Sequence, residues 1–306
     1  MPFLVKQCAQ NTLEKHWAQR IPILQLRAPA ELAADVIGEV FKAIESDNGG
    51  HDRWKVIDFC SGSGGPTPSI EKHLQAQRAR TGRDPVPFYL SDITPNLDAY
   101  VLHASRSENL SFIPDSVDAT DPPFAAISSS TPGDKQAARE QGYEHDGCKV
   151  MRLFSLAFHH FDDEGAKRVI KSTLDTSDAV VIFELQERRA GSLLLMLLEP
   201  VLVYSMAIFW FGHDWLYLVL TYLVPVLPAL HAFDGLISCL RTRTFEEFVE
   251  LLDSALGKKH ERQASGPLVS VQRGDWVFAT HRTLHTWPLG YMNVIVGSKV
   301  RPQQIR

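Results

Sequence analysis

The stretch Trp54-Lys-Val-Ile-Asp-Phe-Cys-Ser-Gly-Ser-Gly-Gly-Pro66 decides the fold, because an apolar strand ends in an acid and then in a glycine-rich bend. A buried parallel strand is short, apolar and rich in β-branched residues. Glycines after such a strand let the backbone approach a ligand where a Cβ atom would collide. The stretch therefore predicts a ligand-binding edge of a parallel sheet.

The composition sets limits on the function. A chain of 306 residues is long enough for one large α/β domain, and a net charge of −5 offers no electrostatic footprint for nucleic acid. Its four cysteines lie far apart and form no C-x-x-C pair, which indicates a reducing compartment and no structural metal. Residues 7–20 are polar, unlike a signal peptide, so we expect a cytoplasmic location.

Strand and helix patterns alternate along the chain. Residues 10–46 have a helical pattern, and further helices are expected at 67–79, 95–107 and 163–174. Strands are expected at 55–59, 86–90, 110–113, 149–154 and 179–184. This order predicts an α/β fold with a doubly wound parallel sheet, in which ligands bind beyond the carboxyl ends of the strands.

Four regions are expected in the chain. They are an N-terminal helical cap (1–50), a Rossmann-like core (51–190), a hydrophobic helical insertion (191–240), and a C-terminal helix with final strands that complete the core (241–306). A capped helix at 244–252 and antiparallel strands at 276–279 and 291–296 would complete a seven-stranded sheet. The polar residues 128–146 are expected to form a surface excursion, and 281–285 a solvated loop between the last strands.

Acids follow two further strands and indicate the ligand. Asp92 ends the second strand, where a carboxylate can accept hydrogen bonds from both hydroxyls of a ribose. The third strand is followed by Asp118 and Asp121, which compete for one role toward the amine of adenine, and Asp121 before Pro122 would suit a turn. A dinucleotide fingerprint would need glycine where Thr67 stands, which disfavours a nicotinamide-dependent reductase. The three elements together predict an adenosine site without phosphates.

With these motifs the chain resembles the class I S-adenosylmethionine-dependent methyltransferases. Asp58-Phe-Cys-Ser-Gly62-Ser-Gly64 matches the family's D-x-G-x-G-x-G loop, and Leu156-Ala-Phe-His-His-Phe161 its fourth-strand segment. The resemblance implies S-adenosyl-L-methionine as the cofactor, no metal, and a cofactor site formed by Asp58, Cys60, Gly62, Gly64, Asp92, Ile93, Asp118, Ala119 and Phe158.

Two positions in that loop leave alternatives open. Cys60 replaces the first glycine, so either the backbone there is in an ordinary conformation or the cofactor sits differently. Asp58 could contact the cofactor, or it could hold loop amides from behind. Both alternatives keep the loop as the cofactor site.

His159 and His160 follow the fourth strand and are the candidate catalytic residues. Methyl transfer depends mainly on positioning the acceptor, and it needs a base only where the acceptor carries a proton. At neutral pH histidine suits that role for a phenol, acid or amine acceptor. Alternatively the pair caps the helix that begins near residue 162 and packs on the sheet. At this site, after the fourth strand, there is no Asn/Asp-Pro-Pro-Tyr/Phe, the signature for planar amides and nucleic-acid bases, so those acceptors are not expected.

Residues 193–230 form a long apolar region, interrupted by Glu199-Pro200, Pro225 and Pro228. Arginines flank both ends and none lies inside, which fits a hairpin dipping into a membrane with Trp210, Trp215 and Tyr217 as interfacial anchors. The alternative is an enclosed helical lid, apolar all round. The stretch from Leu220 to Leu252 resembles a poorly characterised group of methyltransferase-like proteins with the same insertion before the last strands.

Both readings of 193–230 predict methylation of a hydrophobic small-molecule or lipid-like acceptor, on oxygen or nitrogen. A protein that binds the cofactor without methyl transfer, as a lyase, cyclase or scaffold, is the alternative from another class.

Overall fold

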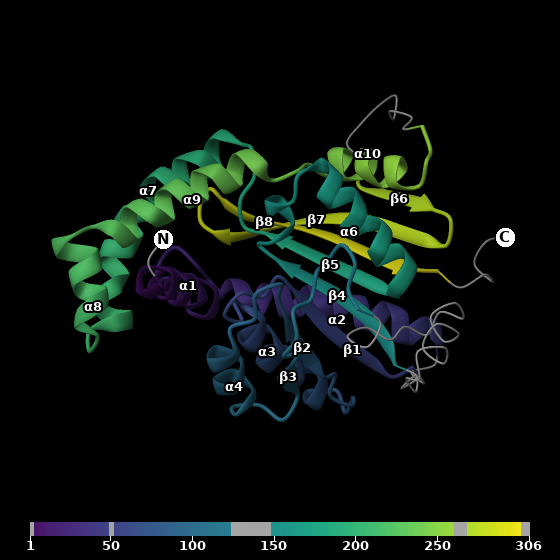
Figure 1. Ribbon diagram of the computed structural model, residues 1–306, viewed down its shortest axis with the longest axis horizontal. Helices are drawn as coiled ribbons and strands as arrows, with labels where there is room; N and C mark the ends of the chain where they lie inside the picture. The colour runs from purple at the N-terminus through teal and green to yellow at the C-terminus, as the bar shows by residue number, and fades with distance from the viewer. Residues whose placement is uncertain (1–2, 49–51, 124–147, 260–267, 301–306) are drawn as a thin grey trace.

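The computed structural model describes residues 3–48, 52–123, 148–259 and 268–300, and the excursion expected at 128–146 lies outside them. One eight-stranded sheet lies between layers of helices, and a helical arm extends beyond it (Figure 1). The strand order is β3-β2-β1-β4-β5-β8-β7-β6.

Five strands run parallel, as the sequence predicted. They are β1 (Trp54–Phe59), β2 (Phe88–Ser91), β3 (Leu110–Phe112), β4 (Lys149–Ser155) and β5 (Ala179–Glu184). The order turns back at β1 and β4, which confirms the doubly wound, Rossmann-like sheet. The carboxyl ends of all five strands therefore meet at one edge of the sheet.

The last three strands are antiparallel and include one that was not expected. β8 (Gly290–Lys299) pairs with β5 and β7 (Trp276–Thr286), and β6 (Ser270–Arg273) adds an eighth, outer strand to the seven predicted. Gly274, with φ of +62°, makes the tight turn between β6 and β7. The expected loop at 281–285 is wrong, because β7 continues through these residues and pairs with β8 up to Leu284, where the register shifts before Thr286.

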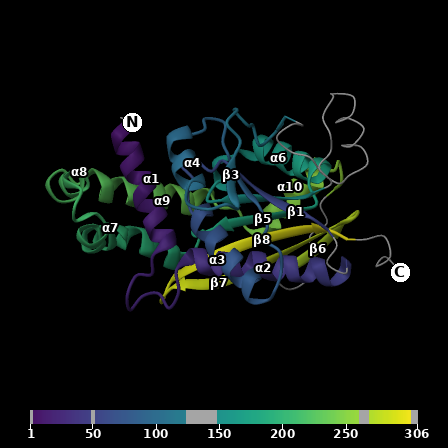
Figure 2. The ribbon, with the colours of Figure 1, turned by 90° about the horizontal axis from the view of Figure 1, so that it is seen from below.

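Helices cover both faces of the sheet. Helices α2 (Pro29–Asn48) and α3 (Thr67–Arg80) share one core with the sheet, together with Tyr100 of α4 (Leu97–Ala104). Helices α6 (Asp163–Thr176) and α10 (Phe245–Ala255) share the core on the opposite face. Figure 2 shows these two pairs on either side of the strands.

The single helical stretch expected at 10–46 is two helices. Helix α1 (Phe3–Ala18) ends before an irregular segment that contains Pro22, and α2 begins at Pro29. Proline lacks the amide proton that continues a helix, which explains the break. Helix α2 forms part of the sheet packing, whereas α1 lies across the helical arm (Figure 2).

The arm consists of α7 (Ala190–Phe211), α8 (Trp215–Leu218), a π-helical turn (Val219–Leu223) and α9 (Val226–Arg241). Helix α7 is long and apolar enough to cross a membrane, and the bent pair after it would count as a second candidate, by length and composition only. Tyr217, expected as an interfacial anchor, is instead buried, and its hydroxyl accepts from Asn11 of α1. Trp215 is exposed, and Trp210 packs edge-on against His16.

Candidate active site

The glycine-rich loop after β1 bends sharply. Cys60, Gly62 and Gly64 have φ of +60°, +59° and +106°, in the left-handed region. A Cβ atom on Gly64 would lie 2.9 Å from the ring of His103, which explains the glycine. Because Cys60 adopts the left-handed conformation in spite of its side chain, the expectation of an ordinary backbone there is wrong.

The carboxylate of Asp92 ties the end of β2 to this loop. Its Oδ2 accepts from the amide of Gly62 at 2.8 Å, and its Oδ1 accepts from the amide of Thr94 at 2.8 Å. Each carboxylate oxygen has a second lone pair for a further donor. Ile93 follows on the exposed side of the strand end.

Asp58 lies behind the loop and is almost fully buried. The hydroxyl of Thr67 donates to its Oδ2 at 2.6 Å, while Oδ1 has no hydrogen-bond partner. Burial raises the pKa of Asp58 well above its ordinary value, although the Thr67 hydrogen bond opposes this. Thr67, which stands where a dinucleotide-binding loop would have glycine, thus has a local structural role.

The third acidic loop lies next to the first two. Burial, together with the nearby carboxylates of Asp92, Asp58 and Asp118, raises the pKa of the Cys60 thiol to about 12. These groups follow three different strands, and the structure brings them together around Cys60. The thiol stays protonated at neutral pH and is no nucleophile.

The other predicted cofactor residues are distributed around this group. Asp118 is exposed and closes a turn by accepting from the Thr120 amide at 2.8 Å, the turn role that the sequence favoured for Asp121. Ala119 is buried, and its carbonyl accepts from Arg152. Phe158 packs in the core against Phe154 and Phe248.

These residues fit the polar half of S-adenosylmethionine. Asp92 stands at the end of β2 with lone pairs free for hydroxyl donors, and the left-handed glycines keep the loop free of side chains. Asp58, buried behind the loop, holds the start of α3 through Thr67 instead of facing the ligand side. Asp92, the loop and Asp118 are the residues that would hold the cofactor.

A second sharp turn follows β4. Leu156 has φ of +54°, and the next residues form a short 3₁₀ helix, Phe158–His160, which places His159 beside β5. The Nδ1 of His159 lies 2.7 Å from Oε2 of Glu184, and its backbone amide donates to Oε1 of the same carboxylate. Glu184 therefore fixes both the backbone and the ring of His159.

The contacts of His159 define its tautomer. A carboxylate only accepts, so Nδ1 carries the proton toward Glu184. In the tautomer with its single proton on Nδ1, the Nε2 atom is an acceptor, and the hydroxyl of Ser238 on α9 lies 3.0 Å from it. This tautomer places an acceptor nitrogen toward α9.

His160 occupies a different environment. Much of its surface is exposed and its ring lies 4.2 Å from that of His159, while desolvation by the neighbouring atoms, together with His159, lowers its pKa. The capping alternative for the pair is wrong, because Asp162 caps α6 by accepting from the Gly165 amide at 2.7 Å.

Arginines after α9 bind this turn. Arg241 donates to the carbonyls of His159 and His160, and Arg243 to that of Phe161. The sequence had suggested these arginines as a membrane flank. Their contacts show that they also hold the candidate catalytic turn.

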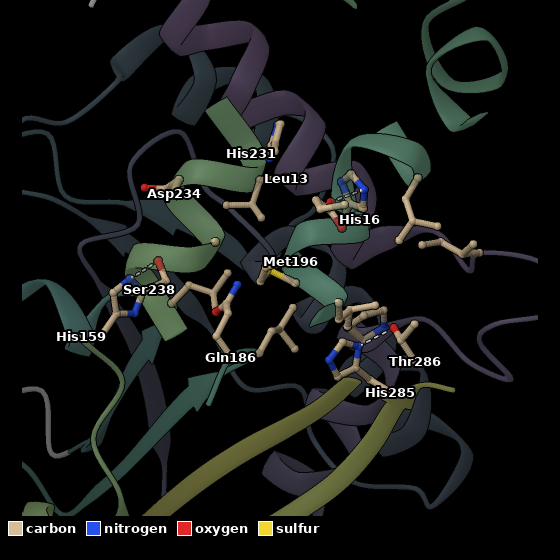
Figure 3. A pocket seen from close by; sticks show the side chains of 18 of the residues that line it. Leu13, His16, His159, Gln186, Met196, His231, Asp234, Ser238, His285 and Thr286 are labelled. Atoms are coloured by element: carbon tan, nitrogen blue, oxygen red, sulfur yellow. Dashed lines mark hydrogen bonds and ion pairs between the residues drawn. The ribbon is translucent and has the colours of Figure 1, made fainter. Parts of the chain in front are cut away.

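A cavity of about 120 Å³ extends from this turn into the arm (Figure 3). His159 and Ser238 line one side, and His285 and Thr286 line the opposite side, with Met196 between them. Further lining residues come from α1, α7 and α9, and include Leu13, His16, Glu199, Leu202 and His231. Because β4 neighbours β1 in the sheet, the cavity begins at the same sheet edge as the glycine-rich loop.

Sequence reasoning missed most of this cavity. Glu184 ends a predicted strand, as Asp58 and Asp92 nearly do, and that signal could have found it. Glu199 stood out as an acid in an apolar run but was read only as an interruption. Nothing in the pattern joins His16, His231 and His285, which the fold brings together from distant segments. Among the described ranges, no three His, Cys, Asp or Glu side chains are arranged to hold a metal ion.

Comparisons with known proteins yield matches only among solved structures. No family model and no curated protein matches this chain. An O-methyltransferase family protein from Burkholderia thailandensis is 11% identical, with a TM-score of 0.43, over 89% of this chain and 57% of its own. Thus this chain spans little more than half the length of that protein.

Two other solved structures are similar over more of their length. A plantazolicin methyltransferase in complex with a pentazolic desmethyl analogue and S-adenosylhomocysteine is 12% identical, with a TM-score of 0.47, over 98% of this chain and 100% of its own. The magnesium protoporphyrin IX methyltransferase from Synechocystis with bound S-adenosylhomocysteine is 12% identical, with a TM-score of 0.39, over 88% and 83%.

Proposed function

We propose that this chain is a cytoplasmic S-adenosylmethionine-dependent methyltransferase that acts on a hydrophobic small-molecule or lipid-like acceptor. The observation that carries the proposal is one sheet edge that bears both an acid-lined glycine loop and a histidine with a carboxylate behind it. The first part suits an adenosine, and the second suits removal of a proton from an acceptor.

The chemistry divides between cofactor and protein. Bound S-adenosylmethionine would supply a methyl group on a sulfonium, and the acceptor oxygen or nitrogen would take that methyl while the departing sulfur keeps the bonding electron pair. His159 Nε2 would receive the proton that the acceptor loses, with Ser238 giving way to the acceptor. Glu184 would stabilise the charged imidazolium that results.

The cavity supports an acceptor that is mainly apolar. Leucines and Met196 form much of the wall between His159 and His285, and burial of an apolar group there is favourable by about 25 cal/mol per Å². In this proposal the inner side of the arm is a wall of the acceptor site, which is the role that the lid interpretation gives it.

We also propose that the outer face of the arm contacts a membrane. Large apolar side chains on this face are exposed, and they include Leu197, Val201, Ile208, Phe209, Leu223, Phe233 and Leu240. So many exposed large apolar side chains on one helical arm are unusual for a soluble monomer, and where they form a patch they are typical of an interaction site. A membrane would cover that face and bring lipophilic acceptors to the cavity.

The proposed activity is tested by a screen of chemically diverse lipophilic acceptors. Full-length protein is incubated with S-adenosylmethionine, and S-adenosylhomocysteine is measured together with the mass of the acceptor. We expect both S-adenosylhomocysteine and an acceptor mass raised by one methyl substitution. Cofactor binding with no turnover across the screen would favour the non-transferring alternative.

A further inference from the structure

The end of the cavity away from His159 is a polar cluster in an otherwise apolar arm. Glu199 of α7 lies at its centre, with Oε1 3.1 Å from Nε2 of His16 on α1. The charge of Glu199 also acts on His231 of α9 and His285 of β7. Four elements far apart in the sequence thus contribute one ionisable side chain each.

The cluster combines one ion pair, Glu199 with His16, and two further histidine rings. Burial alone would raise the pKa of Glu199, but the charge of His16 lowers it below its ordinary value. Glu199 in turn raises the pKa of His16 against the effect of burial. Burial lowers the pKa of both His231 and His285 to about 4, so these two rings are neutral. One ion pair and two neutral imidazoles therefore line this end.

Several polar atoms of the cavity wall are left without partners. His231 Nε2, His285 Nε2 and Gln186 Oε1 are buried and make no hydrogen bond. Leaving such an atom unpaired costs about 1–3 kcal/mol, so native structures rarely tolerate it unless a ligand or water completes the bond. Three such atoms in one cavity indicate an occupant with polar atoms of its own.

The neighbours of His285 define which kind of atom it presents. The Ile21 amide donates to Oε1 of Gln25, which orients the Gln25 amide group so that Nε2 donates to Oγ1 of Thr286 at 2.7 Å. The Thr286 hydroxyl proton is then directed to Nδ1 of His285, 2.8 Å away. A neutral ring that accepts at Nδ1 carries its proton at Nε2. In that tautomer His285 presents an N–H donor, toward which the backbone carbonyl of Leu185 also lies, and Gln186 Oε1 is an acceptor.

A purely structural role explains only part of the cluster. The ion pair of Glu199 and His16 could hold α1 against α7, although a buried pair adds little stability compared with apolar side chains. That role needs neither the unpaired donor on His285 nor the unpaired acceptor on Gln186. A bound group that both accepts and donates a hydrogen bond would satisfy both.

We propose that the acceptor carries a second, neutral polar group, a hydroxyl or carboxamide, which binds at His285 and Gln186 while the methylated atom lies at His159. This inference rests on the proposed function for the assignment of His159. An apolar segment joins the two polar groups along the wall that contains Met196. Glu199 and His16 are paired with each other, so neither offers an unpaired charge to a charged second group.

The test uses matched probes and the full-length chain. One series is 4-alkylphenols with side chains of two to eight carbons, and the second series ends the same chains in a hydroxyl instead of a methyl group. Affinities are measured by calorimetry without cofactor, so that the result does not depend on methyl transfer. The variants are His285→Phe, Gln186→Leu and, as the matched control on the same strand, the exposed His281→Phe.

At the best chain length we expect the wild type and His281→Phe to bind the hydroxyl-ended probe about tenfold more tightly than the methyl-ended probe. An apolar end wall would give the reverse order, because a hydroxyl is costly to bury unpaired. In His285→Phe and Gln186→Leu the preference should fall to about twofold or less. Two variants are used because either one alone could unfold.

Equal affinities in the wild type, a preference retained in both variants, or no binding of either series would each overturn the inference. Its failure is distinguishable from failure of the proposed function. If the probes bind with the hydroxyl preference but no acceptor is ever methylated, the function fails and the second polar site stands. If acceptors are methylated but the probes show no hydroxyl preference, the proposed function stands and the second polar site fails.

Discussion

The cofactor end and the acceptor end of this site are built in different ways. At the cofactor end, Asp58, Asp92 and Asp118 each belong to the end of a parallel strand or the loop after it, and the sheet order brings them together. At the acceptor end, His16 and His285 come from opposite ends of the chain and meet through helices that cross beyond the sheet. The first arrangement can be read from sequence patterns, whereas the second requires the tertiary structure.

The largest expected effect separates the two candidate histidines. His159→Ala should lower the turnover rate by about 100-fold or more with cofactor affinity unchanged, because Nε2 of His159 is the proposed base. His160→Ala should lower it several-fold at most, since His160 is exposed and has no carboxylate behind it. Steady-state kinetics with an acceptor from the screen measure both.

Glu184→Gln offers a further check on His159. It should slow turnover nearly as much as His159→Ala without weakening cofactor binding, because the ring loses the carboxylate that fixes its tautomer. Equal turnover rates for His159→Ala, His160→Ala, Glu184→Gln and the wild type would contradict a role for His159 as the base.

The second effect belongs to the cofactor end. Asp92→Ala should weaken S-adenosylmethionine binding by about 2–4 kcal/mol, because two charge-assisted hydrogen bonds to the ribose are lost. Asp98→Ala, an exposed acid six residues later, is the matched control and should bind normally. Calorimetry on variants shown to be folded measures the change in affinity. Unchanged affinity in Asp92→Ala would contradict the assignment of Asp92 to the ribose hydroxyls.

The third effect is the dependence of stability on pH at the acceptor end. Because burial lowers the pKa of His285 from 6.5 to about 4, the unfolded chain takes up this proton first as pH falls. The resulting stability is fully present above pH 6.5 and is lost as pH falls toward 4, by about 3 kcal/mol in total. His285→Gln should lack this loss, so its free energy of unfolding should rise relative to the wild type on acidification.

Urea unfolding between pH 4.5 and 7.5 measures this difference. The exposed His281→Gln should follow the wild type throughout. Parallel curves for His285→Gln and the wild type would contradict the buried, neutral state of His285. Asp58 at the cofactor end acts in the opposite direction. Its pKa is higher in the folded protein than the ordinary value of 3.8, so its contribution to the free energy of unfolding is lost as pH rises from 3.8 through the raised value.

The fourth effect concerns the outer face of the arm. We expect the protein to pellet partly with membranes, to resist high salt and to be released by detergent, because the contact is apolar. Leu197→Asp with Phe209→Asp should abolish most of this pelleting with little loss of stability, since both side chains are largely exposed. Leu102→Asp, on the exposed side of α4, is the control that should pellet normally.

Fractionation distinguishes the two interpretations of the arm. A double variant that unfolds would show that the arm is an enclosed lid. Soluble, monodisperse wild-type protein without detergent would contradict membrane contact.

The smallest effect is at Cys60. A non-glycine residue in the left-handed conformation is strained, so Cys60→Gly should raise the free energy of unfolding by up to about 1 kcal/mol, reduced by the greater entropy of glycine in the unfolded chain. Denaturant unfolding measures it. A loss of more than about 1 kcal/mol would show that the Cys60 side chain contributes packing that outweighs the strain.

The sequence predicted those parts of the fold that depend on local pattern. The five parallel strands are short apolar runs, and each lies within two residues of its expected position. Strand β6, Ser-Val-Gln-Arg, is partly exposed and lacks an apolar pattern, and it forms only because β7 pairs with it. The same pairing extends β7 through the polar residues 281–285, which read as a loop.

The candidate site shows the same division. Asp92 and His159 could be proposed because each directly follows a strand pattern. Glu199 could not be assigned a partner, because the contact with His16 depends on how α1 crosses α7. Tyr217 was expected at an interface, yet the same crossing buries it against Asn11. Contacts between distant helices leave no periodic signal in a single sequence.

The central claim is that the edge formed by β1, β2 and β3 binds S-adenosylmethionine. Calorimetric titration of S-adenosylmethionine and, separately, of NAD into the full-length chain tests it most directly. We predict saturable binding of S-adenosylmethionine at one site per chain and much weaker binding of NAD. No binding of S-adenosylmethionine, or tighter binding of NAD, would contradict the claim.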